Sequence, residues 1–212
     1  DLAISTDGLK IFFVRRSTNG ANPDMDRLYR YDLTTPYDIS TCYYVEDINP
    51  DTDALALGST AVGDRGDVTR NHVQGVEINP AGTKIFLTFN DASGTKDGLK
   101  EFTLSTPFDI TTMSLVKSAG ISLETASNDN PDAIFFGLVG KRVFVTDHFR
   151  LTVTQFTLTN PYDTSSFTND GEININTLTP GTNNQTRAIA FSKNGLKLFV
   201  SDDTGNEEIF EF

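Results

Sequence analysis

The stretch TLSTPFDITTM, residues 103–113, decides the fold because its pattern occurs three times. It recurs as DLTTPYDISTC at 32–42 and as TLTNPYDTSSF at 157–167. Proline fixes φ and lacks an N–H, so it ends a strand, and the aspartate two positions later can fold its carboxylate onto nearby amides in an Asx turn. We interpret the repeat as a strand connection, with one aromatic side chain packed beneath each turn: Tyr37, Phe108 and Tyr162.

A second string precedes each turn pattern and also occurs near the C-terminal end. It reads STDGLKIFFV at 5–14, NPAGTKIFLT at 79–88, GLVGKRVFVT at 137–146 and SKNGLKLFVS at 192–201. Each copy has a glycine turn followed by an alternating apolar stretch, which predicts a hairpin and its second strand. The third copy lacks the polar residue before its glycine, so we expect a hairpin of different shape there.

The spacing of the strings predicts four units, at about 1–74, 75–131, 132–186 and 187–212. In the first unit, period-two alternation predicts strands at LAIS, KIFFV, LYRYDL and CYYVEDI. No long helical pattern appears. Four short antiparallel strands per unit are typical of β-propeller blades, so we predict an all-β propeller built of four-stranded blades.

Two further expectations follow from this alignment. Equivalent phenylalanines should be buried between blades: Phe12, Phe86, Phe144 and Phe199. The last unit stops at IFEF, before another turn pattern, so we expect these units to be part of a larger ring. A small closed ring lacking one edge strand, or a ring completed by other chains, is the alternative.

The charge balance limits the partners. With 17 Lys and Arg against 29 Asp and Glu, the formal charge is −12, which disfavours nucleic acid and anionic membrane surfaces. No run approaches the roughly 18 to 20 apolar residues of a membrane helix, so we expect no membrane insertion. The single cysteine, Cys42, excludes an intramolecular disulfide and a cysteine-based zinc site.

The strings also resemble a known repeat type. AFSKNGLKLFV with IFEF, and FTLSTPFDITT, are similar to the G(I/V)xFxxDGxKxFV … YxLSTPxDIST repeat proteins, which are common in marine bacteria and their phages. The resemblance covers nearly the whole chain. It implies a propeller fold and an extracellular, cell-surface or virion location, and it implies no particular catalytic residues.

Candidate binding residues lie where the first unit differs from the others. Gly8 and Gly82 are 74 residues apart, whereas Gly82 and Gly140 are 58 apart, a difference of 16 that falls in the loop 50–74. Loops of this length in compact domains are usually functional or disordered. We predict directed contacts from this loop to a protein or glycan partner, or to neighbouring chains. The residues most suited to them are Arg65, Asp67, Arg70 and His72; a loop that only packs over the ring is the alternative.

Acidic loops provide the only metal candidates. Calcium binds six to eight oxygens, and the best placed carboxylates are Asp51, Asp53, Asp202 and Asp203. None of the acidic clusters matches the D-x-[DN]-x-[DN]-G calcium loop, and solvated carboxylates are the alternative. We therefore expect no cofactor, with calcium at these aspartates as the alternative.

Acid–base chemistry has few candidates. Of the two histidines, His148 stands beside Asp147 and Arg150, which could orient its imidazole, although loops hold such trios by chance. Among the channel-lining first strands we find one acid or base, Glu77. We therefore favour a non-catalytic interaction, adhesion or assembly module. The alternative is an extracellular propeller enzyme, such as a calcium-assisted hydrolase or lactonase, with its site at the central channel.

Overall fold

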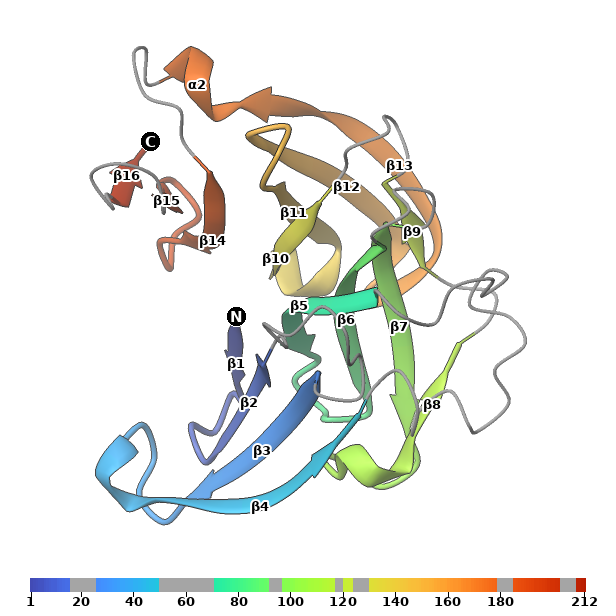
Figure 1. The fold of residues 1–212 in the computed structure, drawn as a ribbon, viewed down its shortest axis with the longest axis vertical. Coiled ribbons are helices and arrows are strands. Elements are labelled where there is room, and N and C mark those ends of the chain that lie inside the picture. Colours follow the sequence, from blue (N-terminus) through green and yellow to red (C-terminus); the bar gives the residue numbers. More distant parts are fainter. Residues whose placement is uncertain are drawn as a thin grey trace.

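The computed structural model describes residues 1–15, 26–49, 71–91, 97–116, 120–123, 130–178, 185–202 and 209–212. Its strands form four antiparallel sheets in a propeller arrangement, so the all-β prediction is confirmed. Figure 1 shows the sheets following one another around an axis, with the first strand of each sheet innermost. Contacts join the first sheet to the second, the second to the third and the third to the fourth. We call these sheets blades 1 to 4.

Blade 1 contains β1 (Leu2–Ile4), β2 (Lys10–Arg15), β3 (Arg27–Leu33) and β4 (Cys42–Ile48). Blade 2 contains β5 (Asn71–Ile78), β6 (Lys84–Asp91), β7 (Gly98–Leu104) and β8 (Met113–Leu115), and the short β9 (Ile121–Ser122) also pairs with β7.

Blade 3 contains β10 (Pro131–Gly137), β11 (Arg142–Asp147), β12 (Thr152–Asn160) and β13 (Asp163–Asn174), followed by the one-turn helix α2 (Ile175–Leu178). Blade 4 contains three strands among the described residues: β14 (Thr186–Phe191), β15 (Leu198–Asp202) and β16 (Ile209–Glu211). No helix within the described ranges is long and apolar enough to cross a membrane.

The hairpins between first and second strands follow the glycine strings. Gly8, Gly82 and Gly195 have φ values of 69°, 67° and 71°, which a side chain rarely adopts. The third hairpin differs, as expected, because it forms a 3₁₀ turn in which Leu138 and Val139 also have positive φ.

The Pro-aromatic-Asp turns connect third and fourth strands, as predicted. Each aspartate accepts a hydrogen bond from the amide two residues later, at 3.0 Å in all three turns. Each aromatic residue donates its amide to the carbonyl of the hairpin glycine in the same blade, at 2.8–2.9 Å. The turn and the hairpin therefore lock together at one end of the blade.

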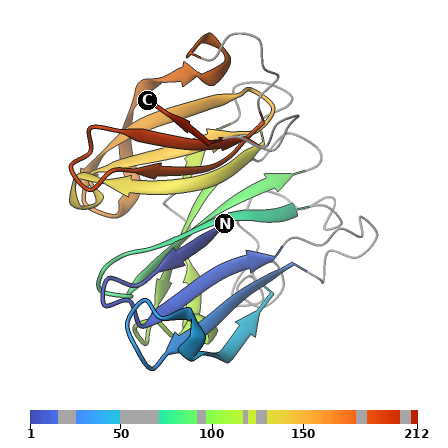
Figure 2. The same cartoon turned by 90° about the vertical axis from the view of Figure 1, so that its left-hand side faces the viewer.

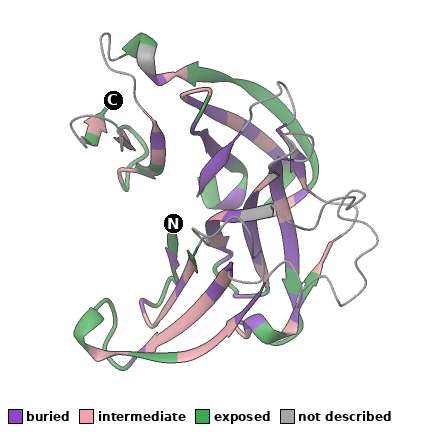
Figure 3. Cartoon of the chain, in the orientation of Figure 1, coloured by how far each residue is buried: buried purple, intermediate pink, exposed green. Residues whose placement is uncertain are grey.

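The core lies between neighbouring blades. Phe12 and Phe86 are fully buried, which confirms the prediction for the first two units. For Phe144 and Phe199 the prediction is wrong, because both are half-buried. Figure 3 shows the difference: the first three strands of blades 2 and 3 are mostly buried, whereas much of blades 1 and 4, and the outer strand β13, is half-buried or exposed. Phe144 of blade 3 and Phe199 of blade 4 are thus less completely covered by neighbouring side chains than Phe12 and Phe86 are.

Candidate functional site

The propeller has two dissimilar ends. The glycine hairpins and the Pro-aromatic-Asp turns lie together at one end. The opposite end, where β5, β10 and β14 begin, we call the variable end, because the connections reaching it differ in length and sequence. Figure 2 shows the two ends of the strands from the side.

Each inner strand of blades 2, 3 and 4 contains a β-bulge near the variable end. The register shifts lie between Val73 and Val76, between Pro131 and Ile134, and between Thr186 and Ala188. In every case a side-chain hydroxyl on the second strand accepts a hydrogen bond from the backbone amide of a glycine or alanine at the bulge. The pairs are Gly75 with Thr88 (2.7 Å), Ala133 with Thr146 (2.8 Å) and Ala188 with Ser201 (3.0 Å). The bulges are thus built in the same way in three blades.

One polar residue precedes each of these small residues, and the three meet at a pocket. Gln74, Asp132 and Arg187, from β5, β10 and β14, line a pocket of about 210 Å³ together with Asp1 and two valines. In a regular strand, successive side chains point to opposite faces of the sheet. A bulge changes the direction of the side chains at that point, so these polar residues can point toward the propeller axis.

Asp132 is the central group of this pocket. Its carboxylate is buried, and Oδ2 lies 3.2 Å from Nη1 of Arg187 and 3.6 Å from Nδ1 of His148. The imidazole of His148 is buried as well. The backbone amide of His148 donates to the backbone carbonyl of Asn130 at 2.9 Å. An acid, an imidazole and a guanidinium from separate elements therefore converge beside the axis.

Carboxamides extend the polar cluster toward blade 2. Oδ1 of Asn130 accepts hydrogen bonds from the side chains of both Gln74 and Asn90. The backbone amide of Asn130 donates to the carboxylate of Asp147 at 2.9 Å. This network links blades 2 and 3, so it holds the walls of the pocket in a defined arrangement.

Asp147 and Arg150, the neighbours of His148 in the sequence, have other partners in the structure. Asp147 accepts the amides of Asn130, Phe149 and Arg150, so its carboxylate holds the turn after β11. The guanidinium of Arg150 pairs with Glu172 on β13. The carboxylate beside the imidazole is instead that of Asp132, from the adjacent inner strand.

Glu77 does not belong to the pocket. It lies opposite Phe86, whose ring contacts Phe136 and Tyr162 of blade 3, so Glu77 faces the interface between the blades. Burial raises the pKa of Glu77 to about 8. Burial and the charge of Glu77 both raise the pKa of Tyr162.

The prediction that the first strands offer only Glu77 is therefore wrong. Asp132 and Arg187 were missed because they stand just before the alternating apolar pattern. A usable signal was present: a polar residue, then Gly or Ala, then a β-branched residue, as in QGV, DAI and RAI.

Most of the other predicted site residues lie outside the described residues: Asp51, Asp53, Arg65, Asp67, Arg70 and Asp203. The backbone of His72 belongs to β5, opposite Asn90, and the backbone of Asp202 belongs to β15, opposite Thr186. Residues 71–74 are thus strand rather than loop. Among the described residues, no three His, Cys, Asp or Glu side chains group into a metal site, and calcium binding by the predicted aspartates stays a prediction.

Comparison with known proteins supports the fold. The periplasmic gluconolactonase of Pseudomonas aeruginosa matches the whole chain with a TM-score of 0.51 and 14% identity. The gluconolactonase XC5397 of Xanthomonas campestris matches 95% of it with a TM-score of 0.50 and 14% identity. The Swd1 β-propeller domain of Myceliophteria thermophila matches all of it with a TM-score of 0.54 and 12% identity.

The chain spans 55%, 53% and 69% of the lengths of these three structures, respectively. At such low identity the likeness establishes the propeller fold alone. Neither a protein-family model nor a curated protein sequence matches the chain.

Proposed function

We propose that this chain carries the catalytic pocket of a propeller hydrolase that opens small cyclic esters, the lactone class. The observation that carries the proposal is the approach of His148 and Arg187 to one carboxylate, that of Asp132, which lines a pocket beside the inner strands together with Arg187. The structural likeness to two gluconolactonases supports the choice of substrate class. Fold similarity by itself does not fix function, so the pocket must carry the argument.

The chemistry of lactone opening matches these three groups. His148, oriented by the carboxylate of Asp132, takes a proton from a water molecule as that water attacks the carbonyl carbon. Arg187 stabilises the negative charge that develops on the carbonyl oxygen. When the ring C–O bond breaks, the imidazolium returns the proton to the leaving alkoxide, so no further reactant is consumed.

Gln74 and Asn130 have a positioning role in this scheme. Their side-chain hydrogen bond spans blades 2 and 3 and forms one wall of the polar cluster. Small-molecule sites typically combine few polar groups with a largely preformed cavity. A pocket of about 210 Å³ suits a ring compound of modest size.

The test is a proton-release assay with glucono-δ-lactone and a panel of aliphatic lactones, corrected for spontaneous hydrolysis. His148→Asn and Arg187→Ala should each lower the rate by about 10²-fold or more. Arg150→Ala is the matched control, since it also removes a guanidinium, and its partner Glu172 lies on the outer strand of blade 3. Parallel assays with EDTA and with added calcium ask whether a metal contributes.

Two results would contradict the hydrolase proposal. One is the absence of enzyme-dependent proton release for every lactone tested. The other is a rate that falls equally in the Arg187→Ala and Arg150→Ala variants, because the axial pocket would then have no special role.

A second candidate function is an interaction or assembly module of an extracellular surface or virion protein. It is favoured by the face of blade 1 that points away from blade 2. There the rings of Phe13, Tyr29, Tyr31 and Tyr44 contact one another, with centroids 4.8–6.5 Å apart. Leu2 on β1 lies opposite Phe13 and is 56% exposed.

The corresponding face of blade 2 is buried against blade 1. In this propeller such a face therefore packs against the blade that precedes it. We propose that the blade 1 face binds a neighbouring blade in an assembly. Tyr31→Ser should weaken that assembly in sedimentation experiments, with Tyr43→Ser as the control. If assembly were unchanged in Tyr31→Ser, this second candidate would be abandoned.

A further inference from the structure

The hairpin glycines of the four blades differ in one respect. In blades 1 to 3 an aromatic ring from the same blade covers the glycine, so close that a Cβ atom would stand 2.2–2.5 Å from it. The pairs are Gly8 with Tyr37, Gly82 with Phe108, and Gly140 with Tyr162. Gly195 of blade 4 has the same backbone conformation, yet nothing described lies within 4 Å of its Cβ position.

In blades 2 and 3 the covering ring also fills the interface with the preceding blade. Phe108 of blade 2 lies 6.5 Å from Phe12 of blade 1, measured between ring centroids. Tyr162 of blade 3 lies 6.4 Å from Phe86 of blade 2 and 5.2 Å from Phe136. In both interfaces the ring thus sits between a phenylalanine of one blade and the hairpin of the next.

Polar contacts from the preceding blade hold each turn in place. Lys10 Nζ lies 5.6 Å from the ring centroid of Phe108, and the equivalent Lys84 donates to the carbonyl of Tyr162 at 2.7 Å. A carboxylate accepts the first amide after the turn aspartate in both cases. Glu46 accepts from Ile110 at 3.1 Å, and Glu101 accepts from Thr164 at 2.8 Å.

Between blades 3 and 4 the equivalent positions line a groove. By strand register Phe144 and Gln155 correspond to Phe86 and Glu101, and Arg142 corresponds to Lys84. Two adjoining cavities of about 700 and 380 Å³ share Phe144, Gln155 and Phe191. The larger one runs from Phe144 to Gly195.

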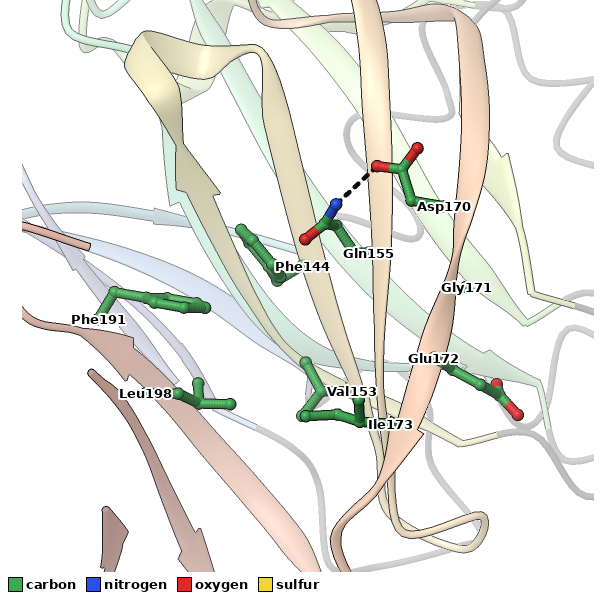
Figure 4. Close-up of a pocket in the computed structure, with 9 residues that line it drawn as sticks. All are labelled: Phe144, Val153, Gln155, Asp170, Gly171, Glu172, Ile173, Phe191 and Leu198. Atoms are coloured by element: carbon green, nitrogen blue, oxygen red, sulfur yellow. Dashed lines mark hydrogen bonds between the residues drawn. The ribbon is translucent and has the colours of Figure 1, made fainter. Parts of the chain in front are cut away.

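Figure 4 shows part of this groove, with Phe144 and Phe191 facing each other. The amide nitrogen of Gln155 donates to Asp170 at 2.7 Å, and its oxygen points to the side of Phe144. That oxygen is therefore placed to accept a backbone amide, as Glu101 does one interface earlier.

We propose that this groove binds an extended segment with the pattern Leu-Ser/Thr-Thr/Asn-Pro-Tyr/Phe-Asp. Its aromatic ring would lie between Phe144 and Gly195, and its strand would pair with the outer edge of β16, which no described strand pairs with. Added strands of this kind gain backbone hydrogen bonds along a free edge, while a side-chain pocket provides specificity.

The occupant lies outside residues 1–212 rather than in a second copy of them. All three turns of this pattern in the chain already cover a glycine of their own blade and donate to its carbonyl. A second copy would have to unfold one of its own blades to supply the ring.

The test uses the 212-residue chain and a synthetic peptide of residues 157–170, TLTNPYDTSSFTND. Calorimetric titration should show saturable one-to-one binding, and the peptide should raise the thermal midpoint of the chain, since it binds only the native state. The peptide carrying Tyr162→Ala should bind at least about tenfold more weakly, because an aromatic anchor in a pocket usually dominates such binding.

Variants of the chain locate the site. Gly195→Ala and Arg142→Ala should weaken binding of the unmodified peptide, whereas Lys141→Ala, which removes the neighbouring positive charge, should not. Circular dichroism shows whether each variant is folded. The proposal fails if the peptide does not bind, if the Tyr162→Ala peptide binds equally well, or if Gly195→Ala and Lys141→Ala weaken binding equally.

Discussion

The Cε2 atom of Tyr162 lies 2.2 Å from the position that a Cβ atom would take on Gly140. The ring and the glycine belong to two turns of one blade that are joined by a backbone hydrogen bond of 2.9 Å. The ring also contacts Phe86 of the blade before. One glycine therefore permits both the closure of a blade and its packing against a neighbour.

This relationship predicts unequal costs for equal substitutions. Gly82 and Gly195 have nearly the same φ, 67° and 71°, so replacement by alanine imposes the same backbone strain of about 1–2 kcal/mol. Only Gly82 is covered by a ring, that of Phe108. Gly82→Ala should lose a further 1–3 kcal/mol or so through overpacking. Urea denaturation of both variants measures the difference, and equal losses would show that the ring can move aside freely.

The buried glutamate of blade 2 offers a second matched pair. Glu101 is fully buried, pairs with Lys84 at 2.6 Å and accepts two hydrogen bonds from Thr164. Glu211 occupies the equivalent place in blade 4, where it pairs with Lys197 in an exposed position. Glu101→Ala should destabilise the fold by about 1–3 kcal/mol, because the buried backbone amide of Thr164 loses its acceptor and the half-buried Lys84 loses its partner.

For Glu211→Ala the expected loss of stability is only about 0–1 kcal/mol, as for other exposed ion pairs. Denaturant unfolding monitored by tyrosine fluorescence gives both values. A loss for Glu211→Ala as large as that for Glu101→Ala would mean that the blade 4 pair is buried in solution, against an occupant of the groove.

The bulge of β5 depends on one hydroxyl. Thr88 accepts the amide of Gly75 at 2.7 Å and donates to the carbonyl of Asp132 at 2.6 Å, so it ties blade 2 to the pocket residue of blade 3. Thr88→Val keeps the shape and leaves the buried amide without an acceptor, which costs about 1–3 kcal/mol.

Thr146→Val is the comparison, since Thr146 accepts the amide of Ala133 within its own blade. Both variants should be less stable than the parent. Thr88→Val should in addition slow any lactone hydrolysis, because Asp132 loses its tie to blade 2. Should Thr146→Val slow hydrolysis more, the link through Thr88 is not what positions the pocket.

The raised pKa of Glu77 predicts a pH dependence of stability. Burial raises the pKa to about 8 from an ordinary value of 4.5, so the folded state binds a proton that the unfolded state has released over this range. The contribution of Glu77 to the free energy of unfolding should therefore be largest below pH 4.5 and should fall as the pH rises toward about 8. Glu77→Gln should remove this fall. Compared with the parent protein, the variant should therefore gain stability between pH 5 and pH 8. Parallel curves for the two proteins would contradict the assignment.

The repeats and their local chemistry could be predicted from the sequence. Period-two alternation, the glycine hairpins and the Pro-aromatic-Asp turns depend on residues a few positions apart, so their hydrogen bonds form wherever the pattern occurs. Four blades follow from four copies. The odd shape of the third hairpin could be expected for the same reason, since its polar turn residue is missing.

The pocket and the groove were decided by tertiary structure. Asp132 and Arg187 are 55 residues apart and meet only because two neighbouring inner strands are bulged at the same level. A bulge adds one residue and reverses the alternation beyond it, so a count of alternating residues assigns these side chains to the wrong face. The half-burial of Phe144 has a similar cause. Its surroundings depend on what the neighbouring blade supplies, and that cannot be read from the string in which the phenylalanine stands.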